Sequence, residues 1–283
     1  MSKFLDDLQL EIEKQQANVF AIAEYHNGTL EARQLVKTNP CQDIYSVSKA
    51  YVVTAIGMLV DRGLLSIQEY MTEILARHCP KAYPQIWDGI TVEMLLLHRV
   101  PLLKNCLDID ACDANGFGED YLVYILNASL PGETAEPEPR YTDAAYYLLS
   151  RIVEERSGMG TDDFLWKYLF YPTGCREAAW SHCPKGHVMG ATGLYLRAED
   201  VVKLGAIYLQ EGCWEGKQIL YPGWVNTVLE KGYELKPQAD GLAFGKGGMR
   251  GQMLTIIPSQ KRAVAYLGCG EYSFVNQIAQ YHE

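Results

Sequence analysis

The chain has 283 residues, enough for one large domain, and 35 acidic against 25 basic residues give a net charge of -10. This charge repels phosphate backbones and no Lys/Arg cluster offsets it, so we expect no nucleic-acid partner. A hydrophobic content of 48% excludes a disordered or fibrous chain. Apolar stretches fall short of the roughly 18 residues of a membrane span, and acids interrupt the N-terminal segment. We therefore expect a cytoplasmic protein without a membrane partner.

The first part of the chain alternates between helical and strand patterns. Apolar residues at helical spacing predict an amphipathic helix over 3–16. Two strands are expected at Val19–Ala23 and Thr29–Val36, joined by a hairpin at Asn27-Gly28, because both turn residues tolerate positive φ. A largely apolar helix is expected from Ser48 to Arg62 and ends at a glycine.

The middle of the chain favours helices. Helical patterns are expected at Thr91–His98, with Thr91 as N-cap, and at Asp143–Glu155, 160–170 and 198–210. Residues 104–140 are rich in Asp, Gly, Pro and Glu and are expected to be mostly loop, apart from an apolar segment at Tyr121–Leu126.

Short apolar runs divided by turns end the chain. These runs, Leu242–Phe244, Met253–Ile257 and Ala263–Leu267, predict strands, and 273–281 predicts a final helix.

Because strand patterns lie near both termini, we predict an α/β (α+β) fold in one domain, 1–283. Its antiparallel sheet, flanked by helices, is built from both ends of the chain in a body of 1–64 plus 191–283. An inserted, mainly helical lobe covers 65–190.

The eight cysteines contain no Cys-x-x-Cys pair and are expected to be reduced and mostly structural. His182, Cys183 and His187 lie within six residues and are an alternative zinc site. A fourth ligand is not visible in the sequence, so a surface loop is favoured and no metal or cofactor is predicted.

Ser46 and Lys49 open the first long helix. A spacing of three residues places both side chains on one helix face, where a buried lysine can act as base for the serine hydroxyl. The helix N-terminus also favours negative charge developing nearby. Alone, the pair is also compatible with an N-cap serine beside an exposed lysine.

A second candidate follows the acidic, proline-rich loop Pro131–Arg140. Tyr141 stands before a helix, where a phenol facing a cleft can transfer a proton. Asp143 is compatible with a role as N-cap of that helix.

A third candidate is Gly245-Lys246-Gly247-Gly248, ahead of a strand. Glycines let a substrate approach the backbone closely, and Lys246 adds a cation, although a plain glycine-rich turn has the same sequence.

Taken together, Ser-x-x-Lys, Tyr-x-Asp and Lys-Gly-Gly in this order resemble the serine β-lactamase and penicillin-binding-protein superfamily. The segments around them at 44–67, 140–158 and 191–204 are similar to that superfamily as well. The resemblance covers roughly residues 19–270 and is closest to the branch of class C β-lactamases, D,D-peptidases and esterases. It implies the β-lactamase/transpeptidase-like fold.

The resemblance also implies roles for individual residues. Ser46 is then the nucleophile, Lys49 its activating partner and Tyr141 a second proton-transfer group. The oxyanion hole is expected at the amide of Ser46 and at one near Met249. The implied substrate-binding residues are Asp143, Lys246, Gly247, Gly248, Met249 and Arg250.

The sequence departs from the family pattern in three places. Asp143 stands where asparagine is commoner, and Leu97–Pro101 stands where many relatives have His-Thr-Ser-Gly. The segment 105–140 is short compared with the family pattern. A Gly-x-Ser-x-Gly elbow is absent, which argues against an α/β-hydrolase nucleophile.

We therefore predict a serine hydrolase that cleaves a small-molecule amide or ester through an acyl-enzyme on Ser46, of the esterase or D-amino-acid peptidase type. The alternatives are a true β-lactamase and a catalytically degenerate binding or regulatory module of the same fold. If Lys49 or Tyr141 must lose a proton, acylation should accelerate from neutral to alkaline pH. The oligomeric state stays open.

Overall fold

The computed structural model describes residues 2–130 and 137–281, so part of the predicted loop Pro131–Arg140 lies outside the described residues. The chain forms two compact units. The first consists of Met1–Tyr51, Tyr168–Ala179 and Leu194–Glu283, and the second of Val52–Lys167 and Trp180–Gly193. These boundaries differ from those of the predicted body and lobe, because helix α2 (Ser48–Asp61) begins in the first unit and continues into the second.

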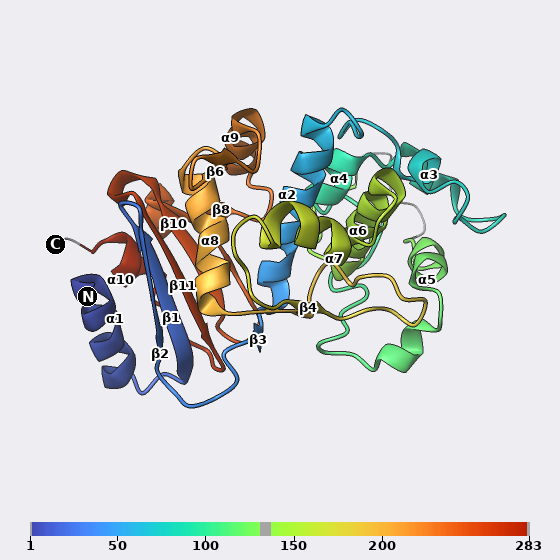
Figure 1. Cartoon of the computed structure of the whole chain (residues 1–283). Helices are drawn as coiled ribbons and strands as arrows, with labels where there is room; N and C mark the ends of the chain where they lie inside the picture. The colour runs from blue at the N-terminus through green and yellow to red at the C-terminus, as the bar shows by residue number, and fades with distance from the viewer. Residues whose placement is uncertain (1, 131–136, 282–283) are drawn as a thin grey trace. The chain divides into compact units, whose positions relative to one another are not determined.

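A six-stranded antiparallel sheet forms the centre of the first unit, in the order β2-β1-β11-β10-β9-β8. Its strands are β1 (Val19–His26), β2 (Thr29–Gln34), β8 (Lys236–Gln238), β9 (Ala243–Gly247), β10 (Met253–Ile257) and β11 (Arg262–Gly268). β1 pairs with β11, with Ala23 opposite Ala265, so strands from both ends of the chain meet in one sheet (Figure 1). This confirms the predicted sheet, to which the structure adds β8.

Alternation along the strands gives the sheet two apolar faces. Leu254, Ile256 and Ala263 face helix α8 (Ala198–Leu209), which lies against one face of the sheet (Figure 1). At Gly205 this helix comes so close that a Cβ atom would stand 2.9 Å from the Cβ of Ala263. The small residue therefore sets how closely the helix and sheet pack.

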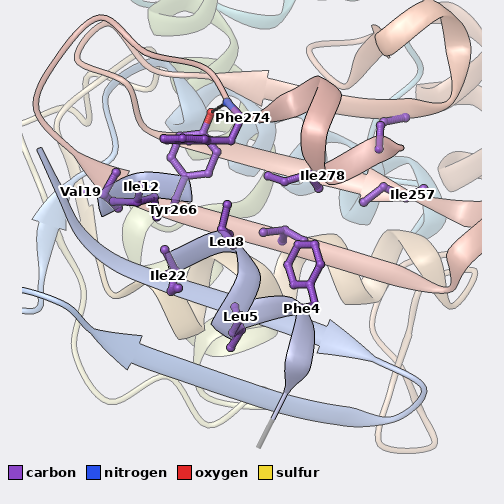
Figure 2. Close-up of a cluster of buried hydrophobic side chains, with 13 residues drawn as sticks. Phe4, Leu5, Leu8, Ile12, Val19, Ile22, Ile257, Tyr266, Phe274 and Ile278 are labelled. Atoms are coloured by element: carbon purple, nitrogen blue, oxygen red, sulfur yellow. Dashed lines mark hydrogen bonds between the residues drawn. The ribbon is translucent and has the colours of Figure 1, made fainter. Parts of the chain in front are cut away.

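The opposite face is covered by α1 (Lys3–Lys14) and α10 (Val275–Ala279), and Figure 2 shows the side chains packed between these helices and the sheet. Phe4, Leu5, Leu8 and Ile12 form the buried stripe of α1 that the helical spacing predicted. They meet a set of strand and C-terminal residues that includes Val19, Ile22, Ile257, Val264, Tyr266, Phe274 and Ile278.

Shorter elements complete the first unit. β3 (Gln42–Asp43) pairs with β5 (Leu194–Leu196), and β6 (Cys213–Trp214) pairs with β7 (Lys217–Gln218). The three-stranded sheet of β3 and β5 also includes β4 (Ala179–Trp180).

Helix α9 (Pro222–Lys231) is a correction to the sequence prediction, which expected no helix there. The Pro-Gly pair at its start is typical of a turn, but Pro222 occupies the first helical turn, where its missing N–H costs nothing. Gly232 ends the helix in the left-handed conformation.

The second unit consists of helices. Beside most of α2 it contains α3 (Met71–Ile74), α4 (Val92–Leu96), α5 (Tyr121–Asn127), α6 (Asp143–Ser157), α7 (Thr161–Leu165) and 3-10 turns at Gln85–Gly89 and Ala114–Phe117. The helix predicted over 160–170 is divided into α7 and a π-helical turn, Trp166–Phe170.

Helix α6 is the centre of this unit. Every residue from Asp143 to Val153 is buried, and α3, α4 and α7 pack around the helix. The predicted N-cap of α4 is confirmed, because the Thr91 side chain caps this helix. Helix α6 ends at Gly158, which has the left-handed conformation. In the part of the chain that the structure describes, no helix has both the length and the apolar character needed to cross a bilayer.

Candidate active site

Ser46 lies in a 3-10 turn, Tyr45–Val47, that leads directly into α2. The Lys49 Nζ donates a hydrogen bond to Ser46 Oγ over 3.0 Å. Lys49 is fully buried, whereas Ser46 is partly accessible. The three-residue spacing therefore brings the two side chains together, as residues on one helix face should be.

Tyr45, the residue before Ser46, has a strained backbone that the sequence did not indicate. Its φ is +46°, in the left-handed region that a bulky residue rarely adopts. Its amide donates to Asp43 Oδ1 at 2.7 Å, and its carbonyl accepts from Ser48 Oγ at 2.5 Å. Contacts on both sides hold this conformation, which sets the direction in which the chain enters the Ser46 turn.

The turn between β9 and β10 lies beside the segment that precedes Ser46. A Cβ atom at Gly248 would stand 2.8 Å from the Ile44 carbonyl oxygen, so this approach requires glycine. Within the turn the Gly248 amide donates to the Gln252 carbonyl and the Arg250 amide to the Gln252 side chain. Among the described residues, the Met249 amide has no hydrogen-bond acceptor.

Lys246 forms an ion pair with Glu234, a residue that the sequence analysis missed. Their side chains are 11% and 1% exposed, so a buried carboxylate compensates the charge of a largely buried ammonium group. Arg250 is exposed and accepts a hydrogen bond from the Gly270 amide with its carbonyl. Glu234 lies outside every motif of the sequence, and only the fold brings it to Lys246.

In the second unit, Tyr141 and Asp143 flank the N-cap of α6, so the N-cap role considered for Asp143 was wrong. Thr142 is the N-cap: its Oγ1 accepts from the Ala144 amide at 3.3 Å and donates to the Cys106 carbonyl at 2.8 Å. Thr142 has the extended backbone of a cap residue, whereas Asp143 is the first residue of the helix and is 6% exposed.

Two further carboxylates lie beside Asp143. Oxygen atoms of Asp108, Asp110 and Asp143 all lie within 4.8 Å of one another, and Thr192 Oγ1 donates to Asp110 at 2.5 Å. Oxygen ligands at this spacing suit a hard cation, although acidic groups also gather without one. The sequence offered no signal for this group, because Asp108 and Asp110 come from a segment without periodicity and only the fold brings them to Asp143.

The alternative zinc ligands do not converge. His182 pairs with an aspartate, the Cys183 Sγ lies 3.4 Å from the Tyr147 hydroxyl, and His187 Nδ1 lies 2.8 Å from a Glu154 oxygen. Burial lowers the pKa of His187 to about 4. Within residues 2–130 and 137–281, these three side chains form no group with the spacing of metal ligands.

The fold and the Ser46 turn define the class of protein. The octameric penicillin-binding protein homologue from Pyrococcus abyssi superposes with a TM-score of 0.73 at 18% identity, covering 98% of this chain and 75% of that chain. The chain thus has the β-lactamase/transpeptidase-like fold, as predicted. The family model described as beta-lactamase matches residues 9–281, so the chain belongs to the beta-lactamase family.

Two curated relatives agree with this assignment. The 6-aminohexanoate-dimer hydrolase of Paenarthrobacter ureafaciens is 25% identical over 202 residues, which cover 67% of this chain and 50% of that protein. Penicillin-binding protein 4 of Amycolatopsis lactamdurans is 29% identical over 156 residues, which cover 54% of this chain and 39% of that protein. The matched region thus spans half or less of the length of these relatives.

Proposed function

We propose that this protein is a serine hydrolase that cleaves a small linear amide or an ester through an acyl-enzyme on Ser46. The observation that carries the proposal is the 3.0 Å hydrogen bond between Lys49 Nζ and Ser46 Oγ, made by a lysine that is fully buried. An amine that is removed from water favours its neutral form, and a neutral amine can accept the serine proton.

In the proposed acylation, Ser46 Oγ attacks the substrate carbonyl carbon while its proton passes to Lys49 Nζ. The negative charge that develops on the carbonyl oxygen is stabilised by the backbone amides of Ser46 and Met249. The proton then moves to the leaving group as the amide or ester bond breaks. The family resemblance assigns this second transfer to Tyr141. A water molecule finally hydrolyses the acyl-enzyme and restores the serine hydroxyl.

The end of strand β9 favours a substrate with an extended acyl chain. β8 begins at Lys236, opposite Gly245, so Lys246 and Gly247 of β9 continue beyond it with one backbone edge not paired to β8. An extended acyl chain can pair with such an edge. One curated relative is a 6-aminohexanoate-dimer hydrolase, and because amino-acid units are joined by amide bonds, this supports an amide as substrate.

Labelling by a fluorophosphonate and by a penicillin-type probe, followed by peptide mapping, tests the proposal. The adduct is expected on Ser46 and should disappear in Ser46→Ala. Ser66→Ala, which removes an exposed serine, is the control and should label like the parent protein. Lys49→Ala should slow acylation by roughly 10²–10⁴-fold, the usual contribution of a positioned proton-transfer group.

A panel of esters, linear amides, D-amino-acid amides and β-lactams then defines the reaction. Turnover of esters or linear amides above β-lactams supports the proposal. Fastest turnover of β-lactams identifies a true β-lactamase, and labelling without turnover of any substrate identifies a degenerate binding module. An adduct on another serine, or full activity of Ser46→Ala, refutes the assignment of Ser46.

A further inference from the structure

His98 is a buried histidine that follows the C-cap residue of α4, Leu97, and the catalytic scheme above does not use it. It is 4% exposed and has a φ of +56°. Its amide donates to the Leu95 carbonyl at 3.0 Å, and the Arg99 amide donates to the Met94 carbonyl at 2.8 Å. These bonds end the helix in a left-handed residue, so the position of His98 is determined by α4.

The backbone around Tyr141 is bonded to His98 and to one further segment. The Arg140 amide donates to the His98 carbonyl at 3.0 Å, and the Thr142 amide donates to His98 Nδ1 at 3.3 Å. The Asn105 amide donates to the Tyr141 carbonyl at 2.9 Å. The peptide group that follows Tyr141 is therefore held on both sides, by Asn105 at its carbonyl and by His98 at its N–H.

The imidazole ring also lies between two tyrosines. Its centroid is 4.7 Å from the Tyr141 ring and 5.1 Å from the ring of Tyr146, a fully buried residue of α6. The Tyr146 hydroxyl donates to the Leu96 carbonyl at 3.2 Å. His98 thus connects the partly accessible Tyr141 to the interior of the second unit.

From this geometry we propose that His98 is a positioning residue for Tyr141: its ring supports the phenol and its Nδ1 orients the following peptide group. The inference rests on the proposed function, in which Tyr141 transfers a proton to the leaving group. An Nδ1 that accepts a hydrogen bond carries no proton, so the ring is the neutral tautomer with its proton on Nε2. His98 acts on the direction of the Tyr141 hydroxyl and does not touch the substrate.

Two substitutions of His98 separate the contact of its ring with Tyr141 from the hydrogen bond between its Nδ1 and the Thr142 amide. His98→Asn keeps an acceptor close to the position of Nδ1 and tolerates the left-handed backbone, but it loses the ring. His98→Phe keeps a ring of similar shape but leaves the buried Thr142 amide without its acceptor. His182→Asn, at an exposed histidine of the same unit, is the matched control.

The readout is kcat for a phenyl ester and an amide with the same acyl group, chosen from the hydrolysed members of the substrate panel. A phenolate leaves an ester without a proton, whereas an amine must be protonated, so loss of Tyr141 function should affect the amide more. We expect both His98 variants to lower kcat for the amide by roughly 10–10²-fold, the effect of a displacement near 1 Å, with KM unchanged. The ester should lose no more than about threefold.

The Tyr141→Phe background distinguishes positioning from general damage. If His98 acts through the Tyr141 hydroxyl, its variants should cause no further loss in Tyr141→Phe, because the group that they misplace is absent. Thermal melting of each variant shows whether it is folded, and His98→Asn keeps the test valid if His98→Phe does not fold.

The outcomes separate the inference from the proposed function. If Tyr141→Phe lowers amide cleavage but the folded His98 variants do not, or if their losses are equal for ester and amide and add to that of Tyr141→Phe, the inference is wrong. If Tyr141→Phe changes nothing, the proposed role of Tyr141 is wrong. If the parent protein hydrolyses no member of the panel, the proposed function is wrong.

Discussion

Replacing Glu234 by glutamine should destabilise the protein, because it removes the charge that compensates Lys246. The two side chains are 1% and 11% exposed, so water cannot take the place of the carboxylate. Removal of one partner of a buried pair typically costs about 3–5 kcal/mol. Because glutamine can still accept a hydrogen bond, we expect the free energy of unfolding to fall by about 3 kcal/mol, at the lower end of that range.

Urea unfolding measures this change. The urea concentration at the midpoint of unfolding should fall, while the slope of the free energy of unfolding against urea concentration stays constant. Glu177→Gln is the matched control. It breaks the ion pair of Glu177 with Arg197, whose atoms are 2.8 Å apart, but the Glu177 side chain is 49% exposed. Such a surface pair contributes about 0–1 kcal/mol.

A double variant tests the reasoning itself. If an uncompensated charge causes the loss, Glu234→Gln combined with Lys246→Met should regain much of the stability, because no buried charge is left unpaired. A loss below about 1 kcal/mol in Glu234→Gln would refute the reasoning, since that is the range of surface pairs. A double variant less stable than Glu234→Gln would show that packing, not charge, is responsible.

Three further outcomes follow from burial, capping and pKa. Thr142→Ala should lower the free energy of unfolding by about 1–2 kcal/mol through loss of the α6 cap, and a larger loss in Asp143→Ala in urea melts would contradict the corrected cap assignment. Leu8→Ala should cost about 2–5 kcal/mol and Leu10→Ala, at a residue 62% exposed, less than about 0.5 kcal/mol; equal losses would mean that α1 does not pack as described. Burial raises the pKa of the Cys106 thiol to about 11, and only the thiolate reacts with iodoacetamide. Alkylation of Cys106, followed by mass spectrometry, should therefore accelerate with pH up to about 11, and a plateau below pH 9 would disprove this.

Local patterns predicted much of the fold because their physical causes are local. Asn27-Gly28 makes a hairpin wherever two strands flank it, since both residues adopt positive φ: the structure has Asn27 at +49° and Gly28 at +86°. The helical spacing of Phe4, Leu5, Leu8 and Ile12 required a buried face, and α1 has one.

Some elements could not be predicted because local signals were ambiguous or weak. Pro-Gly at residues 222–223 is compatible with a turn and with a helix start, and only packing selects the helix α9. The strand Lys236–Gln238 is mostly exposed and contains a proline, so it lacks an alternating pattern; it is a strand because β9 offers hydrogen bonds at its edge.

The candidate active site likewise contains one contact that the sequence indicated and others that only the fold creates. The sequence by itself determined that Lys49 can reach Ser46, because side chains three residues apart lie on the same side of a helical turn. The structure shows that it does so, with the two atoms 3.0 Å apart. Only the tertiary structure decided that Glu234 pairs with Lys246 and that His98 lies against Tyr141. Such contacts join distant segments, and the chain between them can close in many ways. Their partners are chosen by the burial and hydrogen bonding of the whole fold, which no local pattern encodes.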